Sequence, residues 1–210
     1  MIANKRILIL GAHVDDPMIG CGGLIARYSG MADIHVAVFS SSTESTIEAG
    51  FLPATLIQEF YSSARILGID DSKIMLFDYQ TRNFPETRQS ILDTIIGIRK
   101  EVSPDIVMCS GTGDVHQDHA TVRDEAIRAF RSACILGYEI PRNNIKPFNY
   151  DMYVVLEEKH IDIKAAGVDI YATQQHRMRY SDIARASAKL RGADIGKEYA
   201  EAFEVMRWIM

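Results

Sequence analysis

Two short segments of this 210-residue chain concentrate histidine and aspartate. The first is Gly11-Ala12-His13-Val14-Asp15-Asp16, and the second is Asp114-Val115-His116-Gln117-Asp118-His119. They hold three of the chain's six histidines. His13 and Asp16 are three residues apart, as are His116 and His119, a spacing that brings both side chains to one side of a helical turn. An imidazole and a carboxylate from one segment, with an imidazole from the other, predict three metal ligands and an open fourth position, which is typical of catalytic zinc.

A carboxylate beside such a metal would do chemistry of its own. It can take the proton of the bound water, whose pKa the metal lowers towards about 7. Asp15 or Asp16 could instead cap the helix that follows, and Asp118 could cap the next one. Caps alone explain neither the three histidines nor their concentration in two segments. Spacing does not separate Asp15 from Asp16, or His116 from His119, so these roles stay open at this point.

The other histidines are expected to have ordinary structural roles. His35 lies within an apolar strand pattern and His160 lies in a polar turn. His176 could line a pocket, but a surface position is favoured. The chain has no G-x-G-x-x-G after its first apolar run, no P-loop lysine and no G-x-S-x-G. These absences disfavour a dinucleotide-binding dehydrogenase, a P-loop enzyme and an α/β-hydrolase.

Short apolar runs alternate with amphipathic helical patterns along the chain. The predicted strands are Arg6–Leu10, Asp33–Ser40, Lys73–Phe77, Asp105–Cys109 and Met152–Leu156. The predicted helices are Ile19–Tyr28, Thr55–Leu67, Glu86–Val102 and about Asp118 to Ala133. This alternation predicts an α/β, Rossmann-like fold with a mostly parallel sheet flanked by helices. In the strand order 3-2-1-4-5 the first and fourth strands are neighbours, so the active site is expected at their C-terminal ends, where both histidine segments begin.

The rest of the chain adds no second domain in this prediction. Ile161–Arg191 is predicted to form two helices, and Tyr199–Ile209 fits either a helix or a closing strand. Glu139–Asn149 has the composition of a loop and is too short for a domain linker. We therefore expect a single domain over residues 1–210.

Composition narrows the class of protein. The 23 Lys and Arg against 28 Asp and Glu give a net charge of −5, which argues against a general nucleic-acid or membrane-surface binder. The three cysteines show no C-x-x-C spacing and predict reduced, buried thiols rather than disulfides or a thiolate zinc site. The apolar run Ile7–Leu10 is too short for a signal peptide or a membrane span. We expect a cytoplasmic protein.

The two histidine segments resemble a known pair of signatures. Residues 12–16 followed by Ile19-Gly20-Cys21-Gly22-Gly23 resemble the A-H-P-D-D…G-x-G-G signature of the PIG-L/LmbE-like deacetylases. These are zinc-dependent enzymes that remove N-acetyl groups from amino sugars and glycoconjugates. Residues 114–119 resemble the family's second signature, D-x-H-x-D-H. Tyr171-Ala172-Thr173-Gln174 and Tyr199-Ala200-Glu201-Ala202-Phe203 are similar to two further family segments, so the resemblance covers nearly the whole chain.

The resemblance implies roles that spacing could not assign. It implies three ligands for Zn²⁺ or another divalent metal: His13, Asp16 and His119. It implies Asp15 as general base and His116 as the group that stabilises the oxyanion or protonates the leaving amine, with Asp118 orienting His116. The implied reaction is hydrolysis of the N-acetyl group of a small amino sugar or its conjugate, with release of acetate. The family also suggests a homo-oligomer, either a trimer or a hexamer.

Three departures from the family pattern bear on the substrate. Val14 replaces the usual proline, and Pro17-Met18 stand where many members carry a glutamate. The family's glycine- and arginine-rich loop after the second strand is not recognisable in residues 40–46. A catalytically idle sugar- or nucleotide-binding α/β module that keeps the metal site is therefore the alternative function. Four loop residues are predicted to bind substrate hydroxyls or a phosphate: Arg82, Asn83, Asn143 and Asn144.

Overall fold

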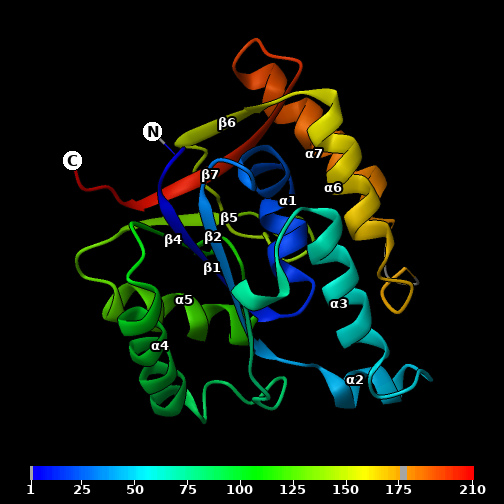
Figure 1. Ribbon diagram of the computed structural model, residues 1–210, viewed down its shortest axis with the longest axis vertical. Coiled ribbons are helices and arrows are strands. Elements are labelled where there is room, and N and C mark those ends of the chain that lie inside the picture. The colour runs from blue at the N-terminus through cyan, green and yellow to red at the C-terminus, as the bar shows by residue number, and fades with distance from the viewer. Residues whose placement is uncertain (1, 176–178) are drawn as a thin grey trace.

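A central sheet divides the protein into two helical layers in the computed structural model, which describes residues 2–175 and 179–210 (Figure 1). The strands are β1 (Arg6–His13), β2 (Asp33–Ser40), β3 (Ile74–Leu76), β4 (Ile106–Ser110), β5 (Cys134–Tyr138), β6 (Met152–Leu156) and β7 (Tyr199–Arg207). The helices are α1 (Asp16–Tyr28), α2 (Thr43–Glu48), α3 (Thr55–Ile66), α4 (Arg88–Val102), α5 (Gln117–Ala129), α6 (Glu158–Asp169) and α7 (Tyr180–Asp194), with a 3-10 turn at Asp71–Lys73. None of the helices in the described ranges is long and apolar enough to cross a bilayer.

The strand order is β3-β2-β1-β4-β5-β7-β6. β1 pairs in parallel with both β2 and β4, and β5 continues the parallel part beside β4. β7 runs antiparallel to β5 and β6. The predicted order 3-2-1-4-5 is therefore confirmed, and an antiparallel pair extends the sheet beyond it. β1 lies in the interior of the parallel part, so its C-terminal end is flanked by strands on both sides.

The strand in the fifth position is not the predicted one. It is Cys134–Tyr138, which follows α5 after a gap of a few residues, whereas the predicted Met152–Leu156 is β6 at the far edge. All five residues of β5 are buried, and a short apolar run cannot be told from the end of a buried helix by periodicity alone. For the same reason, the helix predicted from about Asp118 runs to Ala133, whereas α5 ends at Ala129. The ambiguous C-terminal segment is the strand β7.

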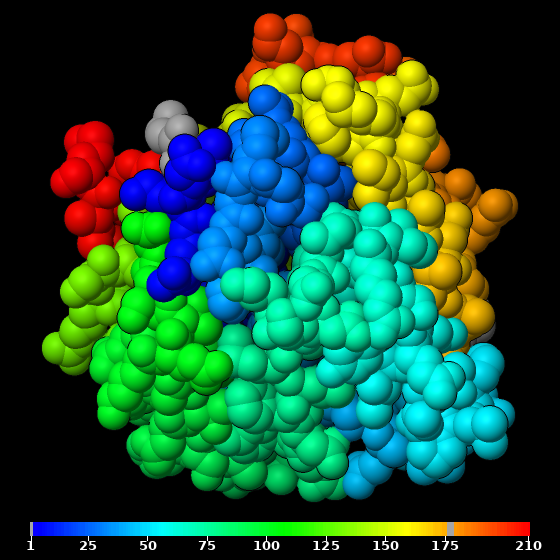
Figure 2. Space-filling model, viewed as in Figure 1, coloured from blue at the N-terminus to red at the C-terminus, as the bar shows by residue number. Residues whose placement is uncertain are grey.

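Both faces of the sheet are buried, and this explains the continuous apolar runs of the parallel strands. In β1, Ile7 and Ile9 face the core beneath α1, α3, α6 and α7, while Leu8 and Leu10 face the core beneath α4 and α5. In the space-filling view the blue strands lie between the green segments of one layer and the cyan and yellow segments of the other (Figure 2). Burial on both faces holds the strand ends that carry the site in a fixed position.

Glycines let α1 approach the sheet unusually closely. A Cβ atom on Gly20 would lie 2.3 Å from the Tyr138 ring, and one on Gly23 would lie 2.5 Å from a methyl group of Leu156. No side chain larger than hydrogen fits at these distances. The G-x-G-G run thus serves helix-to-sheet packing, and it sets the depth of the helix that begins at Asp16.

A buried ion pair anchors the same helix. The carboxylate of Glu201 on β7 accepts hydrogen bonds from the backbone amides of Gly23 and Leu24 at 2.8 and 2.7 Å. It also pairs with the ammonium group of Lys164 on α6 at 2.7 Å. Both side chains are more than nine-tenths buried. α1, α6 and β7 therefore meet at one fully partnered charge cluster, here called the Glu201 anchor.

Candidate metal centre and active site

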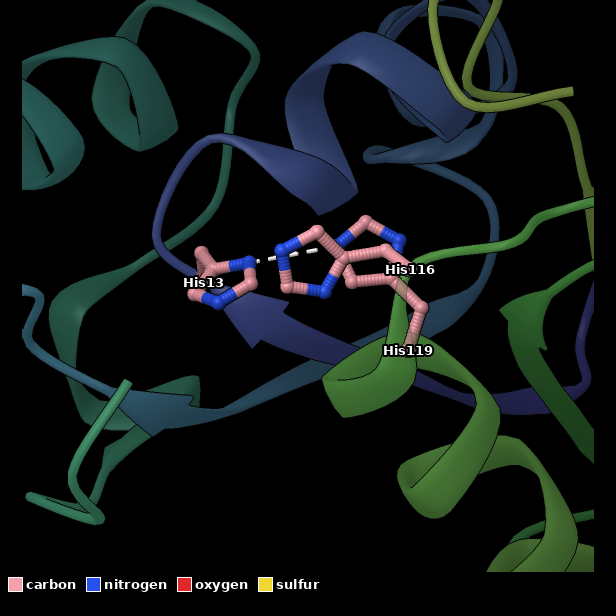
Figure 3. Close-up of side chains that lie close together, drawn as sticks. All are labelled: His13, His116 and His119. Atoms are coloured by element: carbon pink, nitrogen blue, oxygen red, sulfur yellow. Dashed lines mark hydrogen bonds between the residues drawn. The ribbon is translucent and has the colours of Figure 1, made fainter. Parts of the chain in front are cut away.

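The two histidine segments meet at one edge of the sheet, as their position after β1 and β4 predicts. His13 is the last residue of β1 and Asp16 is the first of α1. His116 precedes α5 as its N-cap residue, and His119 lies in the first turn of that helix. Figure 3 shows the three imidazoles turned toward one another, His13 from the end of β1 and the other two from the start of α5. Ring nitrogens of all three lie within 4.8 Å of one another, so this cluster can hold a metal ion.

Three donor atoms are spaced as a tetrahedral metal requires. Nδ1 of His13 lies 3.1 Å from Nε2 of His119 and 3.5 Å from Oδ2 of Asp16. Nε2 of His119 lies 3.3 Å from the same Asp16 oxygen. Zinc bonds of about 2.0–2.1 Å in tetrahedral geometry place neighbouring ligand atoms about 3.3–3.4 Å apart. Two imidazoles and one carboxylate at these distances fit a divalent metal with an open position.

The charges in the cluster also suit a cation. Burial opposes a proton on His13, but hydrogen bonds to the Asp118 and Asp16 carboxylates outweigh it and raise the pKa of His13 to about 10. Burial would raise the pKa of Asp16, yet the positive charge of His119 and the hydrogen bond from His13 hold that pKa well below its usual range. The carboxylates of the cluster thus favour positive charge at the position where the donor atoms converge.

In both His13 and His119, the ring nitrogen that faces away from the converging donor atoms lies close to a buried carboxylate. Nδ1 of His119 lies 2.6 Å from Asp114, and Nε2 of His13 lies 3.1 Å from Asp118. Histidines that bind metals usually have such a partner, which fixes the tautomer and the orientation of the ring. Asp114 also accepts a hydrogen bond from the backbone amide of His116 at 2.8 Å, so it holds both histidines of the second segment.

Asp118 orients a different histidine from the expected one. Its carboxylate contacts His13 and accepts a hydrogen bond from the backbone amide of Arg82 at 2.7 Å, whereas only its backbone amide touches His116, donating to Nδ1 at 3.2 Å. Arg82 lies on the segment that follows β3, and the backbone amides of Arg82 and Phe84 both donate to the Asp118 carboxylate. Side-chain capping does not account for these carboxylates either. Asp15 occupies the N-cap position of α1 but its side chain makes no cap bond, and the Asp16 carboxylate accepts the backbone amide of His13. The N-cap of α5 is His116.

His116 is held as a neutral hydrogen-bond donor. Burial is the largest effect and, with the nearby positive charges of His119 and His13, lowers the pKa of His116 to about 4. Because its Nδ1 accepts the amide of Asp118, the proton of the neutral ring lies on Nε2. A neutral N–H donor beside the converging donor atoms is suited to an oxygen that gains negative charge.

A cleft opens beside these groups. Its lining consists of His13, Asp15, Ser42, Ser45, Leu56, Thr81, Arg82, His116 and Gln174. Of the four residues predicted to bind substrate, Arg82 lies on this wall, and Asn83, Asn143 and Asn144 are not among the lining residues. The backbone of Asn144 instead pairs with Asp114. His176 lies outside the described residues.

The sequence predictions missed two groups of site residues. Asp114 could have been found, because a histidine that binds metal needs a second partner and a carboxylate lies five residues before His119. Gln174 ends one of the segments that resemble the family, which could have pointed to it, whereas Ser42 and Thr81 carry no such signal. The three residues come from three separate segments that only the folded chain brings to one cleft.

Comparison with known proteins shows the same fold in enzymes of two kinds. A protein of Escherichia coli (strain K12) named uncharacterized deacetylase YaiS is 28% identical over 179 residues, covering 79% of this chain and 91% of that protein. The N,N'-diacetylchitobiose deacetylase from Pyrococcus horikoshii superimposes with a TM-score of 0.79 at 22% identity, over 96% of this chain and 84% of that one. GalB, the 4-carboxy-2-hydroxymuconate hydratase from Pseudomonas putida KT2440, also reaches a TM-score of 0.79, at 19% identity and over 98% of both chains. These similarities between structures establish the fold. The reaction has to be inferred from the residues of the site.

The family is settled by the sequence signatures. The family model PIG-L, described as GlcNAc-PI de-N-acetylase, matches residues 8–130. That match spans more than half of the chain and includes both histidine segments, so the resemblance seen in the sequence is confirmed. This chain belongs to the PIG-L family.

Proposed function

We propose that this protein is a divalent-metal-dependent N-deacetylase, which hydrolyses the acetamide of an amino sugar or sugar conjugate and releases acetate. The observation that carries the proposal is the convergence of His13 Nδ1, His119 Nε2 and Asp16 Oδ2 beside a cleft. Asp15 and His116 line the same cleft. Membership of the PIG-L family and the deacetylases among the similar proteins support the same reaction.

The proposed ligands are His13, Asp16 and His119, and Zn²⁺ is the proposed ion. A divalent ion held there supplies a Lewis acid and lowers the pKa of water. Asp15 is the proposed general base, taking a proton from the attacking water and passing it on to the amine that leaves. His116 donates its Nε2 proton in a hydrogen bond to the carbonyl oxygen as negative charge develops there.

The remaining carboxylates act through the histidines. Asp118 holds the His13 ring and Asp114 holds the His119 ring, so that their other nitrogens converge. Arg82, Asn83, Asn143 and Asn144 stay predictions for substrate binding, and for Arg82 its position on the cleft wall is support.

An idle binding module is disfavoured by the residues themselves. The proposed ligands, the base and the imidazole are all present at one cleft. Pro17 and Met18, which replace the family's usual glutamate, are buried in the first turn of α1 and are not among the residues that line the cleft. Proline is well tolerated in this turn because its missing amide hydrogen would have no helical partner there. Their presence removes no group from the proposed machinery.

Metal analysis and acetate release test the proposal together. The purified protein should contain about one equivalent of a divalent metal and should release acetate from at least one class in a panel of free N-acetyl sugars, sugar nucleotides and glycoside conjugates. Chelation should abolish the release, and Zn²⁺ or Co²⁺ should restore it. Hydration of an unsaturated carboxylate without any acetate release would overturn the proposal.

We also propose a cellular location, a domain organisation and an oligomeric state for this protein. A cytoplasmic location is supported by three cysteines that are free and buried. A single domain over residues 1–210 is supported by one sheet that takes strands from both ends of the chain. The proposed trimer or hexamer rests on the family alone, and light scattering of the purified protein would decide between these states and a monomer.

A further inference from the structure

Two buried side chains in the cleft wall have a polar atom without a partner among the described residues. They are Ser42, through Oγ, and Gln174, through Oε1. Ser42 is 7% exposed and Gln174 is 6% exposed. Buried polar atoms without a hydrogen bond cost free energy and are rare in folded proteins, so each calls for an explanation. Both residues line the cleft that also contains His13 and Asp15.

A chain of hydrogen bonds fixes which end of the Gln174 amide is bare. The hydroxyl of Thr173 donates to the carboxylate of Glu59 at 2.5 Å, and the Thr173 backbone amide donates to the other oxygen at 3.1 Å. The Thr173 oxygen can then only accept, so the amide nitrogen of Gln174 donates to it at 3.2 Å. The carbonyl oxygen of Gln174 is therefore the free end, and it is a pure acceptor.

Ser42 combines a hydroxyl that has no partner among the described residues with an unfavourable backbone conformation. It precedes α2, where a serine ordinarily caps the helix with its side chain, but it makes no such bond and has φ +54°. Left-handed backbone is disfavoured for a residue with a Cβ atom and persists only when its surroundings enforce it. Its amide donates to Ser40 Oγ at 3.1 Å, and its carbonyl accepts from the backbone and side chain of Thr46.

The fold ties both residues to the proposed catalytic groups. Ser40, two residues before Ser42, is the register partner of His13 in the parallel pair β1–β2. The Tyr171 hydroxyl, three residues before Gln174, donates to the backbone carbonyl of Val14 at 2.9 Å. Each bare polar atom thus belongs to a segment that is fastened directly to the His13–Asp16 segment.

We propose that Ser42 and Gln174 form a subsite for uncharged hydrogen-bonding groups of the sugar that carries the acetamide, an inference that rests on the proposed deacetylase function. Gln174 accepts a hydrogen bond from a sugar hydroxyl or from the acetamide N–H, and Ser42 exchanges one with a neighbouring hydroxyl. Among the lining residues that the structure describes, Arg82 is the only permanent cation, and its position is exposed. Because both groups of this subsite are uncharged, the substrate class that we assign to it is an uncharged N-acetyl amino sugar rather than one recognised through a phosphate.

Two substitutions separate this role from a structural one. Ser42→Gly removes the hydroxyl and also relieves the left-handed backbone, so the variant should be at least as stable as the wild type. Gln174→Met keeps the length of the side chain and removes the acceptor. The matched controls are Ser62→Ala, whose hydroxyl bonds to its own helix, and Gln175→Met, the neighbouring glutamine that bonds to a backbone carbonyl.

The kinetic readout is the split between KM and kcat. Each of the two variants should raise KM for N-acetylglucosamine or N,N'-diacetylchitobiose by about three- to tenfold, the worth of one neutral hydrogen bond, with kcat and metal content close to wild type. The controls should match the wild type. Unchanged KM in both variants of a protein that does release acetate would overturn the subsite and leave the deacetylase function standing.

A binding measurement keeps the inference testable without turnover. Saturation-transfer NMR with N-acetylglucosamine and with N-acetylglucosamine 1-phosphate should show weaker binding of the uncharged sugar to both variants than to the wild type. A wild-type protein that binds only the phosphorylated sugar, or variants that bind as it does, would overturn the proposed subsite. Failure of the wild type to release acetate from any substrate would count against the proposed function instead.

Discussion

Among the places where the protein buries charged side chains, two differ clearly in how their charges are matched. At the Glu201 anchor, one carboxylate contacts one ammonium group and two backbone amides. The negative and positive charges therefore balance within the protein. At the metal centre, carboxylates crowd around imidazoles, and the charge balance depends on protons held by His13 and His119. The first arrangement stabilises helix packing. The second leaves a demand for positive charge that a cation can meet.

This difference predicts that substitutions in the two clusters act on different quantities. Breaking the Glu201 anchor should cost stability and spare metal binding, because its partners are all structural. Substitutions in the metal centre should reduce metal binding or turnover and should leave the folded structure intact. The neighbouring imidazoles and carboxylates of this cluster already share protons with one another. Four experiments test this separation, from the largest expected effect to the smallest.

Asp15→Asn should have the largest effect on turnover. Loss of a general base should lower kcat for acetate release by about 10²–10⁴-fold. Metal content and melting temperature should stay at wild-type values, because Asp15 is not a proposed ligand and its side chain makes no cap bond at the N-cap position of α1. Acetate release at saturating substrate measures the change. An unchanged kcat would remove Asp15 from the mechanism.

Lys164→Met should have the largest effect on stability. The substitution leaves the buried Glu201 carboxylate without its cation, which should cost about 3–5 kcal/mol of unfolding free energy. Metal affinity of the folded protein should not change. Urea unfolding measures the loss.

Lys159→Met is the control for this comparison. Lys159 pairs with Glu157 at 2.8 Å, a similar distance, but both side chains are about two-thirds exposed. It should cost less than about 1 kcal/mol. Equal losses in the two variants would show that burial does not distinguish the anchor from a surface ion pair.

Asp114→Asn should weaken metal binding without unfolding the protein. Asp114 holds His119 through its second ring nitrogen, and partners of this kind are worth about 10–100-fold in metal affinity. Competition with a chromophoric chelator measures the affinity. Asp124→Asn, which alters an exposed carboxylate paired with Arg123, is the control and should bind metal as the wild type does. Wild-type affinity in the Asp114 variant would place that residue outside the metal centre.

Metal affinity should rise with pH, by up to about tenfold per unit, over the range from 6.5 to about 10. Hydrogen bonds to Asp118 and Asp16 outweigh burial and raise the pKa of His13 above its ordinary value, so the metal-free site holds a proton that an incoming ion must displace. In the metal-free protein the same shift has the opposite consequence, because its stabilising contribution is complete below pH 6.5 and is lost as the pH rises through about 10. Calorimetry in buffers of different ionisation enthalpy counts the released protons, and an affinity that does not vary with pH would contradict this assignment.

The sequence predicts most of the fold because parallel strands that are buried on both faces appear as unbroken apolar runs. Cys134–Tyr138 escapes that rule since it is short and follows a helix closely. The histidine segments were predicted because their residue types are unusual together and because both follow neighbouring strands. The contact of Asp118 with His13 was not predictable, because it depends on where the backbone of Arg82 lies after a separate strand. Gln174 lies in a segment that resembles the family and Ser42 does not, and only folding brings the two residues to one cleft.

The glycines of α1 have a consequence for engineering. Because Gly20 and Gly23 lie against Tyr138 and Leu156, α1 packs close to the sheet, and this close packing positions the helix that begins at Asp16. Residues 41–48, by contrast, follow β2 and include α2, and they bring Ser42 and Ser45 to the cleft. A designer could therefore exchange residues 41–48 to alter substrate choice and keep Ser40, the register partner of His13, whereas Gly23→Ala would press on the side chains of Leu156 and Glu201.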